Sequence, residues 1–221
     1  MAYKKAVFIF IIVVLLAGNT TAHAGYLTKG PISEDHNDFY IGNSIGAYQP
    51  TGPDQSGFST GHGLGIRVGY QFMKYFSVEI GSGFENGQFN SSGVKGTWYF
   101  YEPLALDFKP ILPLSKWNDI YTVLGTGYGA YDDYISSPPP VREVYWDGLY
   151  YNIGIGYERY LHDGHLSVSC AVVYHSFSTK EVHSSLIGQT QVNSLTLPHR
   201  VDLSNVSLEI WVFWRFFRNK E

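Results

Sequence analysis

Six charged residues occur in stretches where every second residue is small, and their types suit ion pairing or ion gating. They are Arg67, Glu79, Asp107, Glu158, Glu209 and Arg215. Arg67 and Glu79 flank one short predicted turn on the same strand face, so we expect their side chains to be neighbours. Charges on an enclosed face are costly unless they are paired. The pattern predicts a polar network that is either a salt-bridged plug or a gate for small ions.

The run His175-Ser176-Phe177-Ser178 is a second candidate for chemistry. It resembles outer-membrane lipid A deacylases, which carry a His and a Ser two residues apart on a late strand. That spacing places both side chains on one face, with a carboxylate orienting the His. Here the residue two positions after His175 is Phe177, and Ser176 falls on the opposite face. We therefore predict a polar, inward-facing histidine and no enzyme activity.

No metal, cofactor or nucleic-acid site is predicted. The single Cys170 excludes a cysteine-based zinc site or an internal disulfide. The glycine-rich stretch 61–65 lacks the following helix and the Lys-Ser pair of a phosphate loop. The net charge of -4 gives no electrostatic footprint for nucleic acid. The remaining candidates have spacings that match no zinc pattern, and they are His162, His165, His183 and His199.

Predicted strands position these residues. Eight stretches alternate with a period of two, and they cover 39–48, 63–72, 76–84, 97–108, 120–128, 149–158, 166–175 and 207–216. Each is long enough for the roughly 9 to 11 residues with which a tilted strand crosses a bilayer. One face is bulky and apolar, whereas the other is mostly Gly, Ser and a few charges. A soluble, lipocalin-like barrel would place the apolar face inside.

This pattern predicts an all-β fold, an eight-stranded antiparallel up-and-down transmembrane β-barrel. The bulky face meets lipid, and the residues predicted there include Ile80, Leu124, Ile155 and Leu208. The connections around 73–75, 109–118 and 161–165 are short, and we expect them on the periplasmic side. The longer connections 50–61, 85–95, 131–147 and 177–205 are expected outside the cell. Interfacial positions are predicted for Trp98, Trp117, Trp146, Trp211 and Trp214.

The first residues have the plan of a secretory signal peptide. Lys4 and Lys5 precede an apolar run over 6–17, and Ala22-His23-Ala24 supplies small residues for cleavage after Ala24. The apolar run is too short to span a bilayer as a helix. We predict a signal peptide over 1–24, a short N-terminal segment over 25–37, an outer-membrane barrel over 38–217 and a C-terminal tail over 218–221.

Several segments resemble the transmembrane barrel of the outer membrane protein A family. Residues 113–125, Pro-Leu-Ser-Lys-Trp-Asn-Asp-Ile-Tyr-Thr-Val-Leu-Gly, resemble the turn and fifth strand of that barrel. Residues 39–42 with Gly46 resemble its first strand, and 69–72 followed by Val78-Glu79 resemble its second hairpin. The final alternation is similar to the terminal signal read by the outer-membrane insertion machinery, and it comprises Leu208, Ile210, Val212, Trp214 and Phe216. The resemblance covers 38–217, without the peptidoglycan-binding domain of full-length members.

The resemblance implies an integral outer-membrane protein of Gram-negative bacteria that stabilises the envelope. It also implies an ionic network inside the barrel, with Glu79 where the family has an acid. The expected partners are outer-membrane lipid, lipopolysaccharide, the insertion machinery and a host or environmental ligand at the external loops. No cofactor is expected. A narrow porin-like channel for ions or small solutes is the alternative, and a lipid A-modifying enzyme is the third hypothesis.

Overall fold

The computed structural model describes residues 38–55, 57–91, 94–137, 142–161, 164–179, 181–186 and 201–216. Its elements are β1 (Asp38–Pro50), the 3-10 helix η1 (Pro53–Gln55), β2 (Gly61–Met73), β3 (Phe76–Ser91), β4 (Val94–Ser115), β5 (Asn118–Ser137), β6 (Arg142–Leu161), β7 (Leu166–Thr179), β8 (Glu181–Leu186), β9 (Val201–Asp202) and β10 (Asn205–Phe216). In this part of the chain, no helix is long and apolar enough to cross a membrane. The predicted signal peptide lies outside the described residues.

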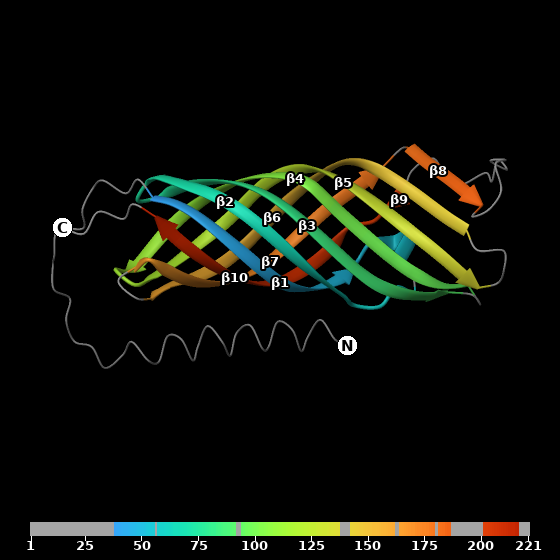
Figure 1. Ribbon diagram of the computed structural model, residues 1–221, viewed down its shortest axis with the longest axis horizontal. Helices are drawn as coiled ribbons and strands as arrows, with labels where there is room; N and C mark the ends of the chain where they lie inside the picture. Colours follow the sequence, from blue (N-terminus) through green and yellow to red (C-terminus); the bar gives the residue numbers. More distant parts are fainter. Residues whose placement is uncertain are drawn as a thin grey trace. The chain divides into compact units, whose positions relative to one another are not determined.

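Eight strands form a closed antiparallel ring. Each strand from β1 to β6 pairs with the next, β7 pairs with β10, and β10 pairs with β1 to close the sheet. Figure 1 shows these strands winding obliquely around one axis. The short β8 pairs with β6 and β9 pairs with β7, both at the end of the ring away from the short turns. The structure confirms the predicted eight-stranded antiparallel barrel.

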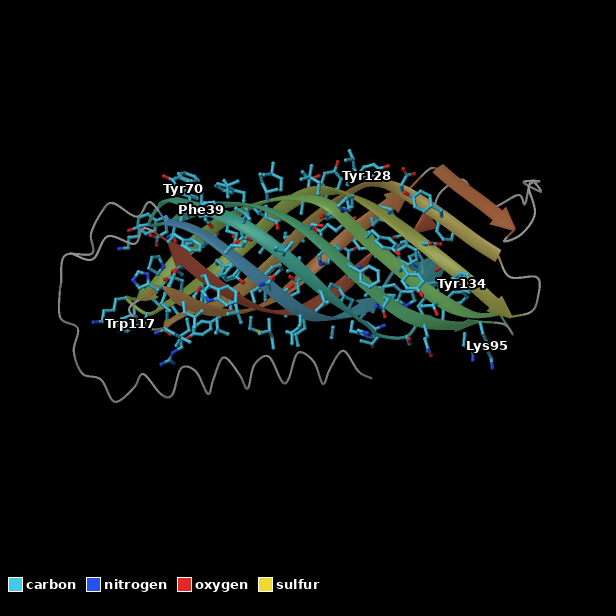
Figure 2. All side chains as sticks on the ribbon, in the orientation of Figure 1. Phe39, Tyr70, Lys95, Trp117, Tyr128 and Tyr134 are labelled. Carbon is cyan, nitrogen blue, oxygen red and sulfur yellow. The ribbon has the colours of Figure 1, made fainter. Side chains whose placement is uncertain are left out.

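The two ends of the barrel differ. We call the end that carries the turns Lys74–Tyr75 and Lys116–Trp117 the turn end, and the end that carries η1, β8 and β9 the loop end. Figure 2 shows Phe39, Tyr70 and Trp117 toward the turn end and Tyr134 and Lys95 toward the loop end.

Several strands are longer than the sequence pattern predicted. The stretches 85–95, 131–147 and 109–118 were expected to be connections, but β3, β4, β5 and β6 occupy most of them. The hydrogen-bonded register continues from Glu85↔Phe100 up to Ser91↔Val94. Polar composition was a poor guide here because, beyond the hydrocarbon, a paired strand can carry polar residues on both faces.

A bulge in β4 explains why the fourth predicted strand alternates imperfectly. Tyr101 pairs with Ala130 of β5 and Leu104 with Tyr128, so β4 has one residue more than β5 between these pairs. The extra residue reverses the parity of the strand. Glu102 therefore points inward from one side of the bulge and Ala105 from the other. Pro103, which has no backbone donor, lies in the bulge.

The outer face is apolar, as predicted. Ile80, Leu124 and Ile155 are 54%, 46% and 48% exposed, which is the accessibility expected of side chains that meet lipid. Leu208 is partly exposed on the same face.

The inner face carries more large side chains than predicted. Rings lie flat against glycine backbones on the neighbouring strand, so a Cβ added at Gly69 would stand 2.2 Å from the ring of Tyr40, and one at Gly156 would stand 2.3 Å from the ring of Tyr121. These glycines make room for aromatic rings inside the barrel. An eight-stranded barrel has an interior that side chains can fill.

The expectation of an interfacial position is wrong for three of the five tryptophans, although the alternation had also placed Trp211 on the inner face. Trp98, Trp146 and Trp211 are buried inside the barrel, whereas Trp117 and Trp214 face outward. The first three stand at inward positions of their strands, where their rings fill space above glycine or between charges. The face of the strand on which a tryptophan stands decides its environment. Its distance from the end of the strand does not.

Candidate functional site

The first part of the interior is a charged cluster centred on Arg67. Its guanidinium donates hydrogen bonds to Asp107 and to Glu79, the latter at 3.3 Å, and it lies 4.7 Å from the centre of the Trp211 ring. Lys109 donates to the other oxygen of Glu79 at 2.8 Å. All of these side chains are buried. Two cations and two carboxylates thus balance one another across the three adjacent strands β2, β3 and β4.

Uncharged groups complete this cluster. The hydroxyl of Tyr40 donates to Glu79 at 2.8 Å, and the amide of Asn152 donates to Asp107 at 3.2 Å. The Lys109 ammonium also lies 4.0 Å from the centre of the Tyr121 ring. Buried charges require this degree of hydrogen bonding to offset the loss of their hydration.

A second charged cluster surrounds Arg215 at the turn end. Arg215 donates to Glu158 at 2.6 Å and to Gln71 at 3.1 Å, and its guanidinium lies 3.8 Å from a carboxylate oxygen of Asp38. Ser167 donates to the same Glu158 oxygen at 2.5 Å. The contacts connect β10 with β1, β2, β6 and β7, so this cluster ties the closing strand to the rest of the ring.

Glu209 belongs to a third, mostly uncharged group. It accepts hydrogen bonds from Ser207 at 2.7 Å and from the indole of Trp211 at 2.8 Å. His175 Nε2 lies 3.4 Å from Glu209 and 3.0 Å from Ser207 Oγ. The histidine is inward, as the sequence predicted, and 1% exposed. A substrate in the surrounding membrane has no access to this histidine and serine.

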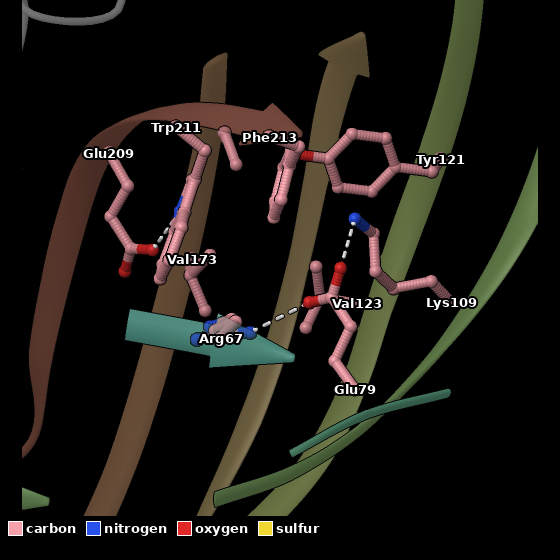
Figure 3. Close-up of a pocket in the computed structure, with 10 residues that line it drawn as sticks. Arg67, Glu79, Lys109, Tyr121, Val123, Val173, Glu209, Trp211 and Phe213 are labelled. Atoms are coloured by element: carbon pink, nitrogen blue, oxygen red, sulfur yellow. Dashed lines mark hydrogen bonds and ion pairs between the residues drawn. The ribbon is translucent and has the colours of Figure 1, made fainter. Parts of the chain in front are cut away.

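One small cavity lies between the first and third groups. Figure 3 shows Arg67, Lys109, Tyr121 and Glu209 around it, with Trp211 and Phe213 forming one wall. Its volume is about 10 Å³, which is room for about one water molecule. The described side chains that line this cavity therefore leave room for little more than one water molecule.

Aromatic side chains fill the interior toward the loop end. The cluster comprises Tyr48, Phe89, Trp98, Phe100, Tyr131, Trp146, Tyr150 and Phe177, together with Ala105 and Leu203. The connection between β1 and β2 folds onto it: Phe58 stacks on Phe89 at 5.0 Å, and Gln55 donates to Tyr131 at 3.3 Å. Asp133 lies nearby, where burial and then Asp132 raise the pKa of its carboxyl well above the usual value.

All six charged residues singled out from the sequence lie in the interior, but not in one network. Arg67, Glu79 and Asp107 lie together; Glu158 and Arg215 lie together; Glu209 bonds to groups around His175. Sequence reasoning missed six buried charges among the described residues, and these are Asp38, Glu85, Glu102, Lys109, Asp119 and Asp133. Lys109 was assigned to a turn, although it is two residues after Asp107 and continues the same inward alternation. Glu102 was hidden by the bulge.

No metal site is apparent in the described part of the chain, where no group of three or more His, Cys, Asp and Glu side chains could hold an ion. His165 is exposed beside the β6–β7 connection. His162 and His199 lie outside the described residues, and nothing is described of the His183 side chain.

The residues of the predicted insertion signal form the outward face of β10. Trp214 and Phe216 are 46% and 43% exposed, and the Phe216 ring lies 6.0 Å from that of Phe39 on β1. Leu208, Ile210 and Val212 continue the same face along the strand. This strand closes the barrel, because β1 pairs with it over its full length.

An apolar exterior, a closed eight-stranded ring and a filled polar and aromatic interior define a transmembrane β-barrel of the outer-membrane type. A family model described as "Outer membrane protein beta-barrel domain" matches residues 10–190. The chain belongs to this family, and it is a protein of the outer membrane. Among curated proteins, none matches the sequence significantly.

Solved structures share the fold at low sequence identity. OprG from Pseudomonas aeruginosa is 17% identical, with 83% of this chain and 97% of OprG covered and a TM-score of 0.55. Neisserial surface protein A is 9% identical, with 80% and 97% covered and a TM-score of 0.54. Ail of Yersinia pestis, solved with the heparin analogue sucrose octasulfate, is 14% identical, with 82% and 99% covered and a TM-score of 0.51.

Proposed function

We propose that this protein is a structural, envelope-stabilising barrel that does not transport solutes. The observation that carries the proposal is the filled interior at the level of Arg67. Its ion pairs with Asp107 and Glu79 join the adjacent strands β2, β3 and β4, and the adjoining cavity holds only about one water molecule. The Arg215 cluster and the aromatic cluster fill the levels on either side. Such an interior favours a rigid membrane anchor.

A narrow channel for ions or small solutes is the alternative function. It requires a continuous wetted path, and the described interior supplies polar side chains that bond to one another instead. A lipid A-modifying enzyme requires a nucleophile and a base that face the membrane. In the run 175–178 that was considered for catalysis, the one contact between a His and a Ser that the described residues make is that of His175 with Ser207. Both of these side chains face the barrel interior.

The proposal includes an orientation and a set of partners. The turn end faces the periplasm and the loop end faces outward, because barrels of this kind have short periplasmic turns. The outer face contacts lipid and lipopolysaccharide, and β10 is the segment that the insertion machinery reads. The loop end contacts a host or environmental ligand. The fold neighbour Ail, named as an attachment protein and solved with a heparin analogue, supports a role of this kind for the external end.

Solute uptake by reconstituted vesicles tests the proposal. Vesicles that contain purified, folded protein are placed in iso-osmotic solutions of arabinose or glycine, and swelling is followed by light scattering. A general porin serves as the positive control, and empty vesicles serve as the negative one. We expect vesicles that contain the protein to swell as slowly as empty vesicles. A swelling rate that depends on solute size would establish a channel.

A further inference from the structure

The outer face of β1 carries one amide side chain among the residues that meet lipid. The outward positions of this strand are occupied in turn by Phe39, Ile41, Asn43, Ile45 and Ala47. Asn43 is exposed, and its side chain makes no hydrogen bond to another described residue. An amide that faces hydrocarbon alone is costly, because acyl chains replace none of the hydrogen bonds that water would offer it. A polar side chain at such a position is a candidate for contact with a partner inside the membrane.

Asn43 stands near the middle of the apolar band. Phe39 lies at the edge of the band at the turn end, as does Tyr70, its register partner on β2 (Figure 2). From Phe39 to Asn43 the strand rises about 10 Å, at about 3.3 Å for each residue and a tilt of about 40°. The band is about 25 Å high. The short side chain of an asparagine therefore reaches neither water layer, in contrast to the long stems of Lys and Arg.

Apolar side chains surround the amide. Its register partners are Ile66 on β2 and Val212 on β10, and both lie on the outward face. Toward the loop end stand Ile45 and its partner Leu64, which are 62% and 61% exposed and so protrude from the barrel wall. We call this patch the Asn43 face, and define it by Asn43, Ile45, Leu64, Ile66 and Val212. It is an apolar surface with one amide at its centre.

We propose that the Asn43 face is the contact surface of a dimer of this protein within the membrane. Two copies that are inserted in the same orientation are related by a two-fold axis normal to the bilayer. Such an axis places each residue at the same depth as its equivalent in the other copy. A second copy therefore supplies an amide at the depth of Asn43, whereas lipid supplies none.

The chemistry of the amide fits this partner, because an amide is complementary to itself. Its carbonyl oxygen accepts and its NH₂ group donates, so two Asn43 side chains exchange a pair of hydrogen bonds. Polar side chains that bond across an interface stabilise association in a membrane, where apolar contacts alone compete with equally apolar lipid. The protruding Ile45 and Leu64 of each copy pack around the pair of amides and exclude lipid from it.

This inference goes beyond the proposed function and does not depend on it. The contact uses the outer wall of the barrel, so it forms whether or not the interior conducts ions. The two-fold axis is normal to the bilayer whichever end of the barrel faces the periplasm. Failure of the dimer would therefore leave the proposed function unaffected.

Sedimentation equilibrium of the folded protein in density-matched detergent micelles tests the inference. We expect a reversible equilibrium between monomer and dimer for the wild type. Asn43→Leu should weaken association about tenfold, since it removes the pair of amides. The variant should keep the heat-dependent gel shift of a folded barrel, because leucine is favourable on a lipid-facing strand position. Asn43→Gln retains an amide and should keep most of the association.

The matched control is Thr122→Val. Thr122 is an exposed, outward polar residue of β5, which lies on the opposite side of the ring, and it stands four residues from the turn-end limit Asn118 as Asn43 does from Phe39. Thr122→Val should associate as the wild type does.

Disulfide cross-linking in phospholipid vesicles then locates the contact. In a Cys170→Ser background, Asn43→Cys should form a covalent dimer on oxidation, and Thr122→Cys should not. A wild type that stays monomeric, an Asn43→Leu variant that dimerises as the wild type does, or equal cross-linking at the two positions would each overturn the inference.

Discussion

Replacement of Arg67 by methionine tests whether the interior charges hold the barrel together. Methionine keeps an unbranched apolar stem but removes the charge. Glu79 would retain its hydrogen bonds from Lys109 and Tyr40. Asp107 would retain only the amide of Asn152 among its hydrogen bonds to described residues. The variant therefore leaves one buried carboxylate without a cation.

The expected loss of stability follows from these contacts. Removal of one partner from a buried ion pair costs about 3–5 kcal/mol. The cation–π contact with Trp211 contributes about 1 kcal/mol more, and relaxation around the smaller side chain offsets part of the total. We expect Arg67→Met to lower the free energy of unfolding by about 4 kcal/mol.

A double-mutant cycle identifies the cause. Asp107→Asn in the Arg67→Met background removes the unpaired charge, so the double variant should lie only about 1–2 kcal/mol below the wild type. Unfolding by urea in phospholipid vesicles, followed by tryptophan fluorescence and by the gel shift of the folded barrel, measures all four proteins. An Arg67→Met variant within about 1 kcal/mol of the wild type, or strictly additive single effects, would refute this account of the network.

Three further predictions concern the barrel in its membrane. Ile155→Arg should lower the free energy of unfolding by about 2–4 kcal/mol because it places a charge against lipid, whereas Ile155→Leu should change it little; equal stability of the two in vesicles would reverse the inside–outside assignment. Phe216→Ala should reduce the yield of folded protein in the outer membrane, and deletion of 218–221 should not; the opposite result in a heat-shift gel assay would place the insertion signal elsewhere. A membrane-impermeant amine reagent on intact cells should modify Lys95 and leave Lys116 unmodified, as mass spectrometry would show; the reverse pattern would invert the orientation.

The sequence predicted the barrel well because lipid imposes a simple rule on the outer face. Side chains such as Ile155 and Leu124 must be apolar at every second position, and this alternation identified all eight strands. The rule ends where the hydrocarbon ends. The strand extensions at 85–91 and 131–137 were therefore missed, although they are hydrogen-bonded as regularly as the membrane-spanning parts.

The interior was predicted less well because charged, polar and aromatic side chains can all fill it. Trp98 was assigned to the membrane interface, and it fills the interior instead, because its inward position depends on the bulge at Pro103. The composition does not show that the bulge reverses which residues of the strand face inward. Lys109 could have been found by continuing the alternation from Asp107. The division of the charges into separate groups depends on barrel closure, which brings β10 against β1, and only the structure shows it.

The central claim is that the interior is closed to ions, and single-channel recording tests it most directly. Purified, folded protein is inserted into planar phospholipid bilayers in 1 M KCl, where the Debye length is about 3 Å and exposed charges at the barrel ends are screened. The account predicts that insertion, verified by recovery of folded protein from the bilayer, produces no steady conductance, and that Arg67→Met produces none either. Steady wild-type conductance that falls as larger cations replace K⁺ would contradict the account and establish a channel.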